Sequence, residues 1–315
     1  MTRIVTLGGG TGQGQLLRGL SRRGLDVTGI VGVTDNGGHS GHLRREYGLP
    51  AVGDVRNCLT ALGDRRNVLR QVLDIRFGTG ELEGASLGNL ILAALTTVEG
   101  SLTKAVSKLA ALSGVRGTIL PVSEDSGQIA ARLSTGKTIR GEWEIIRRKP
   151  RSRIIRVFHK PPIVATPQAL HALKRADLVV LGPGSLRTAL VSILLATGVR
   201  AALRGKRVAY VLNILTQAGQ TDGFTARDHV DEIARYLGRP PDRVIANTKR
   251  PPAWAIGDAD WVDPSGLETR GGDLLEKVRR RDAHRRARPA RFVAGPHLVR
   301  HDPAKLARAV MEVLQ

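Results

Sequence analysis

Short apolar runs that stop at glycine or polar residues alternate along the chain with segments of helical periodicity. Residues 3–7 form a β-branched and apolar run that ends at three glycines, and Leu16, Leu17 and Leu20 then repeat at helical spacing. Residues 27–33 form a second strand-like run, which leads into a polar, glycine-rich stretch. Two strands joined by a crossover helix make a βαβ unit, whose parallel strands bring the loops at their carboxyl ends to one edge. We therefore expect both glycine loops to face the same crevice.

The same alternation continues towards the C-terminus. Helical periodicity marks residues 87–98, 102–112 and 303–314, and strand-like runs cover residues 118–122, 154–157, 176–181 and 208–212. Strands that alternate with helices predict an α/β fold with a mostly parallel sheet covered by helices on both faces. No repeat or low-complexity linker is evident, so we expect one domain over residues 1–315, with a small subdomain or sheet extension at about residues 118–162.

Composition narrows the class of protein. A chain of 315 residues with 41% apolar and 24% charged residues can bury a sizeable core. No apolar run reaches the roughly 18 residues that a membrane span needs, and the N-terminus lacks the layout of a signal peptide. We therefore expect a cytoplasmic protein without a membrane span. The single cysteine, Cys58, excludes an intramolecular disulfide, and nothing accompanies it at metal-ligand spacing, so no metal site is predicted.

The chain is strongly basic, with 49 Lys and Arg against 28 Asp and Glu and a formal net charge of +21. Such an excess attracts polyanions of any kind, nucleic acids included. Aromatic residues, which serve single-strand binders as stacking platforms, make up only 3% of the chain. The basic run at residues 279–291 is more simply explained as a solvated helix face. We therefore do not expect nucleic acid to be the natural partner.

The first candidate binding motif is the glycine loop at residues 8–12. Glycines let the backbone approach a ligand closely, and the free amides at a helix N-terminus, with its dipole, bind phosphate. The dinucleotide fingerprint G-x-G-x-x-G fails, because Gln13 or Gln15 stands at its last position, and no Gly-Lys-Ser/Thr follows to make a Walker A loop. A turn that only connects strand to helix is the alternative.

The second motif, residues 34–41, is followed by Arg44 and Arg45. Small residues, hydroxyls and arginines at the end of a strand suit an anionic ligand, and Asp35 is available for a ribose, a sugar hydroxyl or a metal ion. An ordinary asparagine–glycine turn, formed by Asn36 and Gly37, is the competing interpretation.

The third motif places Asp54, Arg56 and Asn57 at the start of a helix. Asp54 can cap this helix, and capping alone is a sufficient structural reason for it. An arginine in the first turn is unfavourable with the helix dipole, so a bound anion would account for Arg56.

Four further polar stretches lie at the ends of predicted elements. They are residues 86–89, 182–188, 213–225 and 300–302. The stretch at 182–188 is a second glycine-rich turn between strand and helix, with Ser185 and Arg187 added. It is not the G-x-S-x-G elbow of a hydrolase, and no histidine and acid are identifiable as triad partners. We therefore interpret it as another anion cradle.

Together these strings resemble the YvcK/CofD-like family, and specifically its gluconeogenesis-factor branch. The matching strings are GGGTG at residues 8–12, GGHSGHLRRE at 37–46, GDVRNCL at 53–59, GNL at 88–90, ADLVVLGPGSL at 176–186, NILTQAGQTDGF at 213–224 and RHD at 300–302. Their order and spacing span most of the chain, which makes the resemblance specific. The second loop departs from the branch, because Asn36 stands where the branch has an aspartate.

The resemblance implies a Rossmann-like core that binds a nucleotide sugar of the UDP-N-acetylglucosamine type as a regulator linked to gluconeogenic growth, cell shape and cell-wall precursor supply. It implies no catalytic residue and no firm cofactor. The ligand-binding residues expected from the motifs and the resemblance are Gly9, Gly10, Thr11, Gly12, Asp35, Asn36, Gly37, Gly38, Ser40, Arg44, Asp54, Arg56, Asn57, Asn89, Gly182, Gly184, Ser185, Asn213, Thr216 and Arg300.

The family's other branch contains 2-phospho-L-lactate transferases, which act on a deazaflavin-type acceptor. This chain lacks their Asn-Thr-Gly-Asp-Asp string, although Asp35 falls in the corresponding region. In this alternative the protein is a phospho-group transferase in which Asp35 helps to hold Mg²⁺. Whether the protein catalyses any reaction and whether it forms a homo-oligomer stay open at this point.

Overall fold

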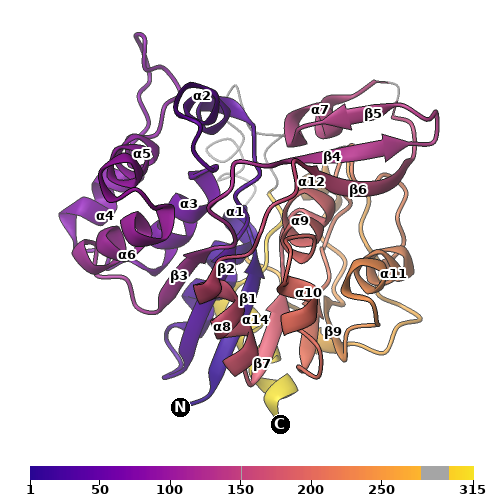
Figure 1. Cartoon of the computed structure of the whole chain (residues 1–315). Coiled ribbons are helices and arrows are strands. Elements are labelled where there is room, and N and C mark those ends of the chain that lie inside the picture. Colours follow the sequence, from indigo (N-terminus) through magenta and orange to yellow (C-terminus); the bar gives the residue numbers. More distant parts are fainter. Residues whose placement is uncertain (150, 278–297) are drawn as a thin grey trace.

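A computed structural model describes residues 1–149, 151–277 and 298–315 (Figure 1). The basic run expected to form a solvated helix face, residues 279–291, lies outside the described residues. Within the described ranges no helix combines the length and the apolar character that crossing a membrane requires.

Seven parallel strands form the main sheet, in the order β10-β9-β8-β7-β1-β2-β3. They are β1 (Arg3–Gly8), β2 (Asp26–Val31), β3 (Thr118–Pro121), β7 (Leu178–Leu181), β8 (Val208–Val211), β9 (Arg243–Asn247) and β10 (Arg270–Gly272). The order runs one way from β1 to β3 and the other way from β7 to β10, so it reverses between β1 and β7. Open α/β sheets bind ligands at such a reversal, outside the carboxyl ends of the strands.

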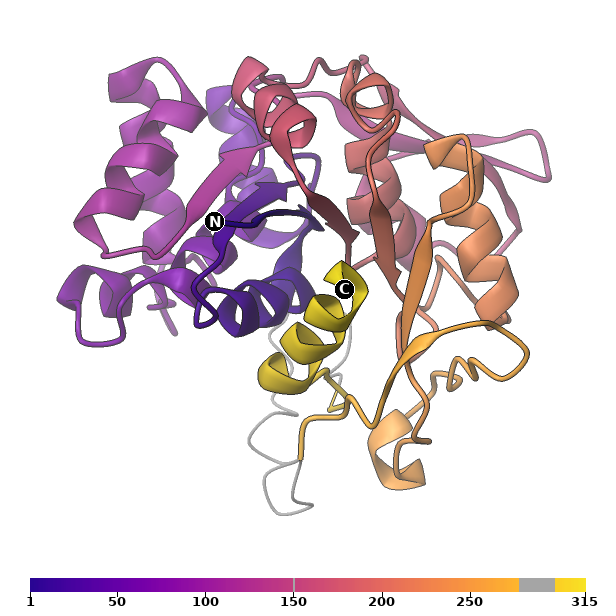
Figure 2. The ribbon, with the colours of Figure 1, turned by 90° about the horizontal axis from the view of Figure 1, so that it is seen from below.

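Helices cover both faces of this sheet. Figure 2 shows the two layers of helices with the sheet between them, seen from below. One face carries α1 (Gly10–Leu20), α3 (Gly53–Leu62) and α14 (Pro303–Leu314), and the other carries α8 (Pro167–Arg175), η1 (Leu186–Val191), α9 (Ser192–Leu194), α10 (Val199–Ala202) and α11 (Ala226–Leu237). The remaining helices are α2 (Gly38–Tyr47), α4 (Val68–Leu73), α5 (Leu87–Glu99), α6 (Leu102–Leu112), α7 (Glu142–Arg147) and α12 (Ala253–Ile256). The predicted α/β fold with a mostly parallel, doubly covered sheet is confirmed.

The strand sequences explain why these segments are central. β7 reads LVVL and β8 reads VAYV, and all of these side chains are fully buried. Continuous apolar runs of this kind suit parallel strands that are covered on both faces. In α1 the predicted helical stripe of Leu16, Leu17 and Leu20 is also fully buried, which confirms the helix and its core-facing side.

A second sheet of three antiparallel strands lies above the carboxyl ends of the main strands (Figure 1). It contains β4 (Gln128–Leu133), β5 (Thr138–Arg140) and β6 (Ile154–Lys160), with α7 inserted between β5 and β6. Its small core includes Ile129, Ile145 and Val157. Within the stretch expected to form an extension, β3 belongs to the main sheet, and the separate sheet begins at β4.

Candidate functional site

The glycine loop between β1 and α1 lies directly against the loop that follows β7. A Cβ atom added at Gly12 would stand 2.6 Å from the carbonyl oxygen of Pro183, closer than real Cβ contacts come. A Cβ added at Gly184 would stand 3.3 Å from the carbonyl oxygen of Gly9. Both glycine loops expected to cradle an anion therefore meet at the reversal point of the sheet.

This meeting point is open to solvent. Gly10 and Gly12 on one loop, and Gly184 and Ser185 on the other, are partly exposed, and Thr11 is exposed. The strand residues beneath them are fully buried. The backbone at the mouth of the crevice is therefore accessible to a ligand, while the floor is rigidly packed.

Four neighbouring helices, α1, α2, α3 and α5, begin without a hydrogen bond from the side chain of their own N-cap residue. Asp54 of α3 accepts the backbone N–H of Gly10 in α1. Asn89 Nδ2 of α5 donates to Ser40 Oγ of α2 at 3.0 Å, and a Cβ at Gly53 would stand 2.6 Å from the same oxygen. Helix N-termini carry unsatisfied N–H groups and a partial positive charge, so their convergence favours an anion.

Three carboxyl groups stand in the same crevice. Asp35 follows β2, Asp54 lies in the first turn of α3, and Glu142 opens α7 below the small sheet. The negative charge of Asp35 acts on both Asp54 and Glu142, which places the three carboxyls near one another. Each is partly exposed.

Their surroundings disfavour the ionised forms. Removal from water raises the pKa of Asp35, although the N–H of Gly37 donates to its Oδ1 at 2.7 Å. Burial together with the charge of Asp35 raises the pKa of Asp54 to about 7. The same two causes raise the pKa of Glu142 well above its usual range. Perturbation of this kind is typical of functional sites.

Side chains of the second loop dock the small sheet onto the crevice. Asn36 Oδ1 accepts the N–H of Trp143 at 2.9 Å, and its Nδ2 donates to Glu144 at 2.9 Å. Both ends of the Asn36 amide are therefore engaged with α7. Ser192 Oγ lies 2.7 Å from Thr34 Oγ1 and 2.9 Å from His159 Nε2, which joins the same loop to β6.

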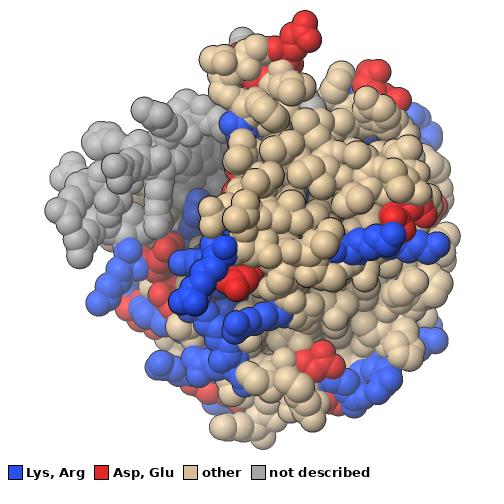
Figure 3. Space-filling model, turned by 90° about the vertical axis from the view of Figure 1, so that its left-hand side faces the viewer, with Lys and Arg blue, Asp and Glu red and all other residues tan. Residues whose placement is uncertain are grey.

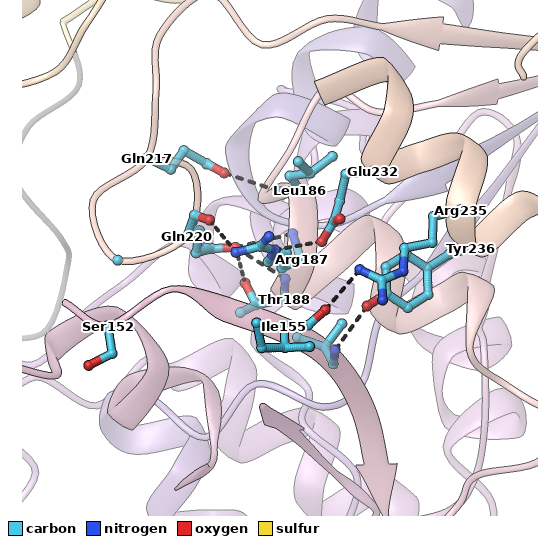
Figure 4. Close-up of polar contacts among 12 residues, drawn as sticks. Ser152, Ile155, Leu186, Arg187, Thr188, Gln217, Gln220, Glu232, Arg235 and Tyr236 are labelled. Carbon is cyan, nitrogen blue, oxygen red and sulfur yellow. Dashed lines mark hydrogen bonds and ion pairs between the residues drawn. The ribbon is translucent and has the colours of Figure 1, made fainter. Parts of the chain in front are cut away.

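The beginning of η1 is closed by two glutamine side chains, shown in Figure 4. Gln217 Oε1 accepts the N–H of Leu186 at 3.0 Å, and Gln220 Oε1 accepts the N–H groups of Arg187 and Thr188, each at 3.2 Å. These backbone donors are therefore not free for an anion. Any contact from this turn has to come from the preceding loop, at Gly182, Gly184 and Ser185.

Two of the expected anion-binding arginines are engaged within the fold. Arg44 is buried and donates to the carbonyl oxygens of Thr34, Ser126 and Gly127. It thereby fixes the loop that carries Asp35. Arg56 is also buried and is paired with Asp74 at 3.1 Å.

The other residues that we expect to bind the ligand lie at the start of α2, in α3 and after β8. Gly37 and Gly38 lead into α2 beside Asp35, and Asn57 bonds to Asp54. Thr216 exchanges hydrogen bonds with the backbone of Asp260, next to the buried Asn213 at the end of β8.

Arg300 is positioned by the segment that follows β10. Its carbonyl oxygen accepts the N–H of Glu276, and the neighbouring His301 pairs with Leu275. β10 is the edge strand of the main sheet, and β9, β8 and β7 separate it from the reversal point. The ligand role expected of Arg300 therefore stays a prediction.

Sequence reasoning missed Glu142 and the two capping glutamines. Glu142 carries no motif of its own, because its partners Asp35 and Thr188 are distant in sequence. Gln217 and Gln220 do stand in the string at residues 213–224, where only Asn213 and Thr216 were expected to act. The sequence did contain a signal for their role, namely two glutamines three residues apart that follow a predicted strand.

A cavity of about 430 Å³ lies on the flank of the molecule, between β6 and α11. It is lined by Arg187, Phe224, Asp228 and Glu232 among others, and it contains none of the expected ligand residues. Over the described part of the chain, no group of three or more His, Cys, Asp or Glu side chains is arranged to hold a metal ion. The candidate site is the carboxyl end of β1 and β7, where the two glycine loops meet at the reversal point of the sheet.

Comparison with known proteins places this geometry in context. The family model described as 2-phospho-L-lactate transferase CofD matches residues 4–280. A protein of Thermotoga maritima is 42% identical over 252 residues, which cover 79% of this chain and 80% of the relative. The gluconeogenesis factor of Bacillus subtilis is 39% identical over 240 residues, covering 75% of each chain.

The similarity extends to three dimensions. A crystal structure of a Bacillus halodurans protein superposes with a TM-score of 0.87 at 32% sequence identity, and the match covers 98% of this chain and 99% of that one. The fold is therefore shared over almost the whole length of a solved relative.

Proposed function

Since this chain belongs to the CofD family, within its gluconeogenesis-factor branch, we propose that it binds a nucleotide sugar of the UDP-N-acetylglucosamine type in the crevice and acts as a regulator. The observation that carries the proposal is the contact of the two glycine loops at the reversal point of the sheet. Gly12 lets the two loops meet without a side chain between them, and exposed backbone amides at the start of a helix suit a diphosphate.

The polar groups around the loops support a ligand that is both anionic and rich in hydroxyls. The diphosphate lies over the junction where residues 9–12 meet residues 182–185, next to the start of α1. Asp35 and Asp54 face the same crevice and accept hydrogen bonds from sugar or ribose hydroxyls. Arg44 and Asn36 support the site without contacting the ligand. The side chain of Arg44 holds the loop of Asp35, and the side chain of Asn36 holds the small sheet.

The likeness to gluconeogenesis factors supports a regulatory role in carbon metabolism. Cell shape and the supply of cell-wall precursors are the outputs that we propose for it, because a UDP-amino sugar is itself such a precursor. The three carboxyl groups with raised pKa values support the assignment of the crevice as the functional site.

Calorimetric titration tests the proposal. UDP-N-acetylglucosamine, UDP-glucose and NAD are titrated into the protein with and without Mg²⁺, and we expect micromolar binding of the UDP-sugars alone. In the same assay Arg300→Ala should weaken binding by about 1.5–3 kcal/mol if Arg300 makes a charge-assisted contact. Arg45→Ala, which removes an exposed charge from α2, is the matched control.

Two results would change the assignment. Unaltered affinity in Arg300→Ala removes this arginine from the site and leaves the ligand in place. Silence with both UDP-sugars, together with Mg²⁺-dependent turnover of an activated phospho-lactate donor and a deazaflavin-type acceptor, replaces the regulator with a phospho-group transferase.

A further inference from the structure

The cavity between β6 and α11 lies between two elements that are bonded to each other. Arg235 Nη1 donates to the carbonyl oxygen of Ile155 at 2.8 Å, and Tyr236 Oη accepts the N–H of Val157 at 2.9 Å (Figure 4). These bonds tie α11 to β6, which is an outer strand of the small sheet. The two elements that form the cavity are therefore held in place by the fold.

One wall of the cavity is a charged stripe along α11. Residues three and four apart lie on one face of a helix, and the α11 residues that line the cavity follow this spacing. They are Asp228, Asp231, Glu232 and Arg235. Glu232 is buried and already paired with Arg187 at 2.7 Å, and Asp228 caps α11 by bonding to Thr225. By contrast, Asp231 is exposed and forms no ion pair with another described residue.

The rest of the lining supplies a free cation and apolar surface. Arg153 stands immediately before β6, is exposed, and forms no ion pair within the part of the chain that the structure describes. Ile155 is 41% exposed, and Phe224 is partly exposed beside it in the lining. The cavity therefore offers one unpaired group of each charge next to an apolar surface.

The balance of charge limits what this cavity can hold. Six of its nine lining residues are charged, three of each sign, so a wholly apolar ligand would remove charges from water without compensation. A polyanion would meet three carboxylates, and a polycation would meet three arginines. A ligand with one charge of each sign satisfies both unpaired groups at once. The volume of about 430 Å³ lies in the range of small-molecule sites.

We propose that this cavity is a second ligand site, which takes the zwitterion of a free amino acid or a dipeptide. The ammonium group binds Asp231 and the carboxylate binds Arg153, both through charge-assisted hydrogen bonds. An apolar side chain of the ligand packs against Ile155 and Phe224. The inference stands apart from the proposed function, because the cavity contains none of the residues expected to bind the nucleotide sugar.

Saturation-transfer NMR on the full chain tests the site directly. The probes are the standard L-amino acids in one arm and the dipeptides Gly-Leu, Leu-Gly and Leu-Leu in the other. We expect at least one probe with an apolar side chain to bind, and the arm in which it binds identifies the source of the zwitterion. If no probe binds at about 5 mM, where a millimolar site would be occupied, the inference is overturned.

Matched halves of the ligand separate a zwitterion site from a site for a single charge. For L-leucine, 3-methylbutylamine keeps the side chain and the ammonium group, and 4-methylpentanoate keeps the side chain and the carboxylate. The corresponding amine and acid serve for any other amino acid that binds. Each half should bind at least about tenfold more weakly than the whole, since it loses one charge-assisted contact. A half that binds as tightly as the whole overturns the inference.

Charge-removing variants place the ligand in the cavity. Asp231→Asn and Arg153→Gln should each weaken binding at least about tenfold, for the same reason. Asp258→Asn and Arg227→Gln, which change exposed residues outside the lining, are the matched controls and should bind as the wild type does. Circular dichroism confirms that each variant is folded. Wild-type affinity in either cavity variant overturns the inference.

Titration of UDP-N-acetylglucosamine into the same proteins keeps the two proposals apart. If the amino acid or dipeptide binds and the nucleotide sugar does not, the proposed function fails and the second site stands. If the nucleotide sugar binds and every zwitterion fails, the second site is overturned and the proposed function stands.

Discussion

Gly12 shows how a single missing side chain creates the candidate site. It lies in the first turn of α1, where its backbone packs directly against the carbonyl group of Pro183. Any Cβ at this position would push α1 away from the loop after β7. The contact between the two loops therefore depends on this residue more than on the other glycines of the string.

We predict that Gly12→Ala lowers the free energy of unfolding by about 1–3 kcal/mol, as overpacking does, and lowers the affinity for UDP-N-acetylglucosamine. Urea unfolding and calorimetry measure the two effects. Gly78→Ala is the control, because a Cβ at Gly78 would meet nothing within 4 Å. Wild-type affinity in a folded Gly12→Ala protein would show that the ligand does not lie between these loops.

At this scale the sequence predicted where the glycine loops lie, but not the contacts that several polar side chains make within the fold. Gly9 and Gly12 could be recognised because a glycine string between strand and helix has few other purposes. Arg44 looked equally suited to an anion, yet it binds three backbone carbonyls, and Asn36 binds α7. Their acceptors are distant in sequence, so no local pattern could reveal that these donors were already engaged.

Between elements, η1 and α11 are held together by a buried ion pair (Figure 4). Arg187 Nε lies 2.7 Å from Glu232 Oε1, and the side chains are only 6% and 9% exposed. Arg187 also donates to the carbonyl oxygen of Gln220 at 2.8 Å and stacks over Phe224 at 5.0 Å. The pair thereby holds the capping loop and η1 in the arrangement that positions Thr188.

We predict that Arg187→Met destabilises the protein by about 3–5 kcal/mol, because it leaves Glu232 buried without a partner. The double variant Arg187→Met/Glu232→Met should recover most of this loss. Urea unfolding of the four proteins gives the coupling energy. Arg151→Met, which removes an exposed partner of Asp222, should change stability by less than about 1 kcal/mol. A double variant as unstable as the single one would show that the pair itself, and not the orphaned acid, stabilises the fold.

The elements themselves were largely predictable. Residues 87–98, 102–112 and 303–314 showed helical periodicity and form α5, α6 and α14. Strands such as β7 could be predicted because they are apolar on both faces. By contrast, β10 (Arg270–Gly272) has no apolar side chain and is a strand only through its pairing with β9. The η1 segment is a π-helix, which is wider than an α-helix. An apolar helical sequence looks the same in both kinds of helix, so only the structure distinguishes them.

At the scale of the molecule, charged side chains are unevenly distributed over the side seen in Figure 3. Figure 3 shows the side that carries α4, α5 and α6, where a broad uncharged area separates charged margins. α5 contains no charged residue before Glu99, and Val98 is 79% exposed.

This uneven distribution leads to a prediction that separates charge from site. Duplex DNA should bind at 50 mM salt because of the net charge of +21, and this binding should fade by about 0.2 M, since each phosphate contact releases a counterion. UDP-N-acetylglucosamine binding should change little over the same range, because helix N-termini and hydrogen bonds inside a crevice are screened less than exposed charges. Fluorescence anisotropy with labelled DNA and calorimetry with the nucleotide sugar measure the two slopes. Nanomolar DNA binding that persists at 0.2 M would mean that the basic surface is a recognition site, and the nucleotide sugar would then be one ligand of a nucleic-acid-binding protein.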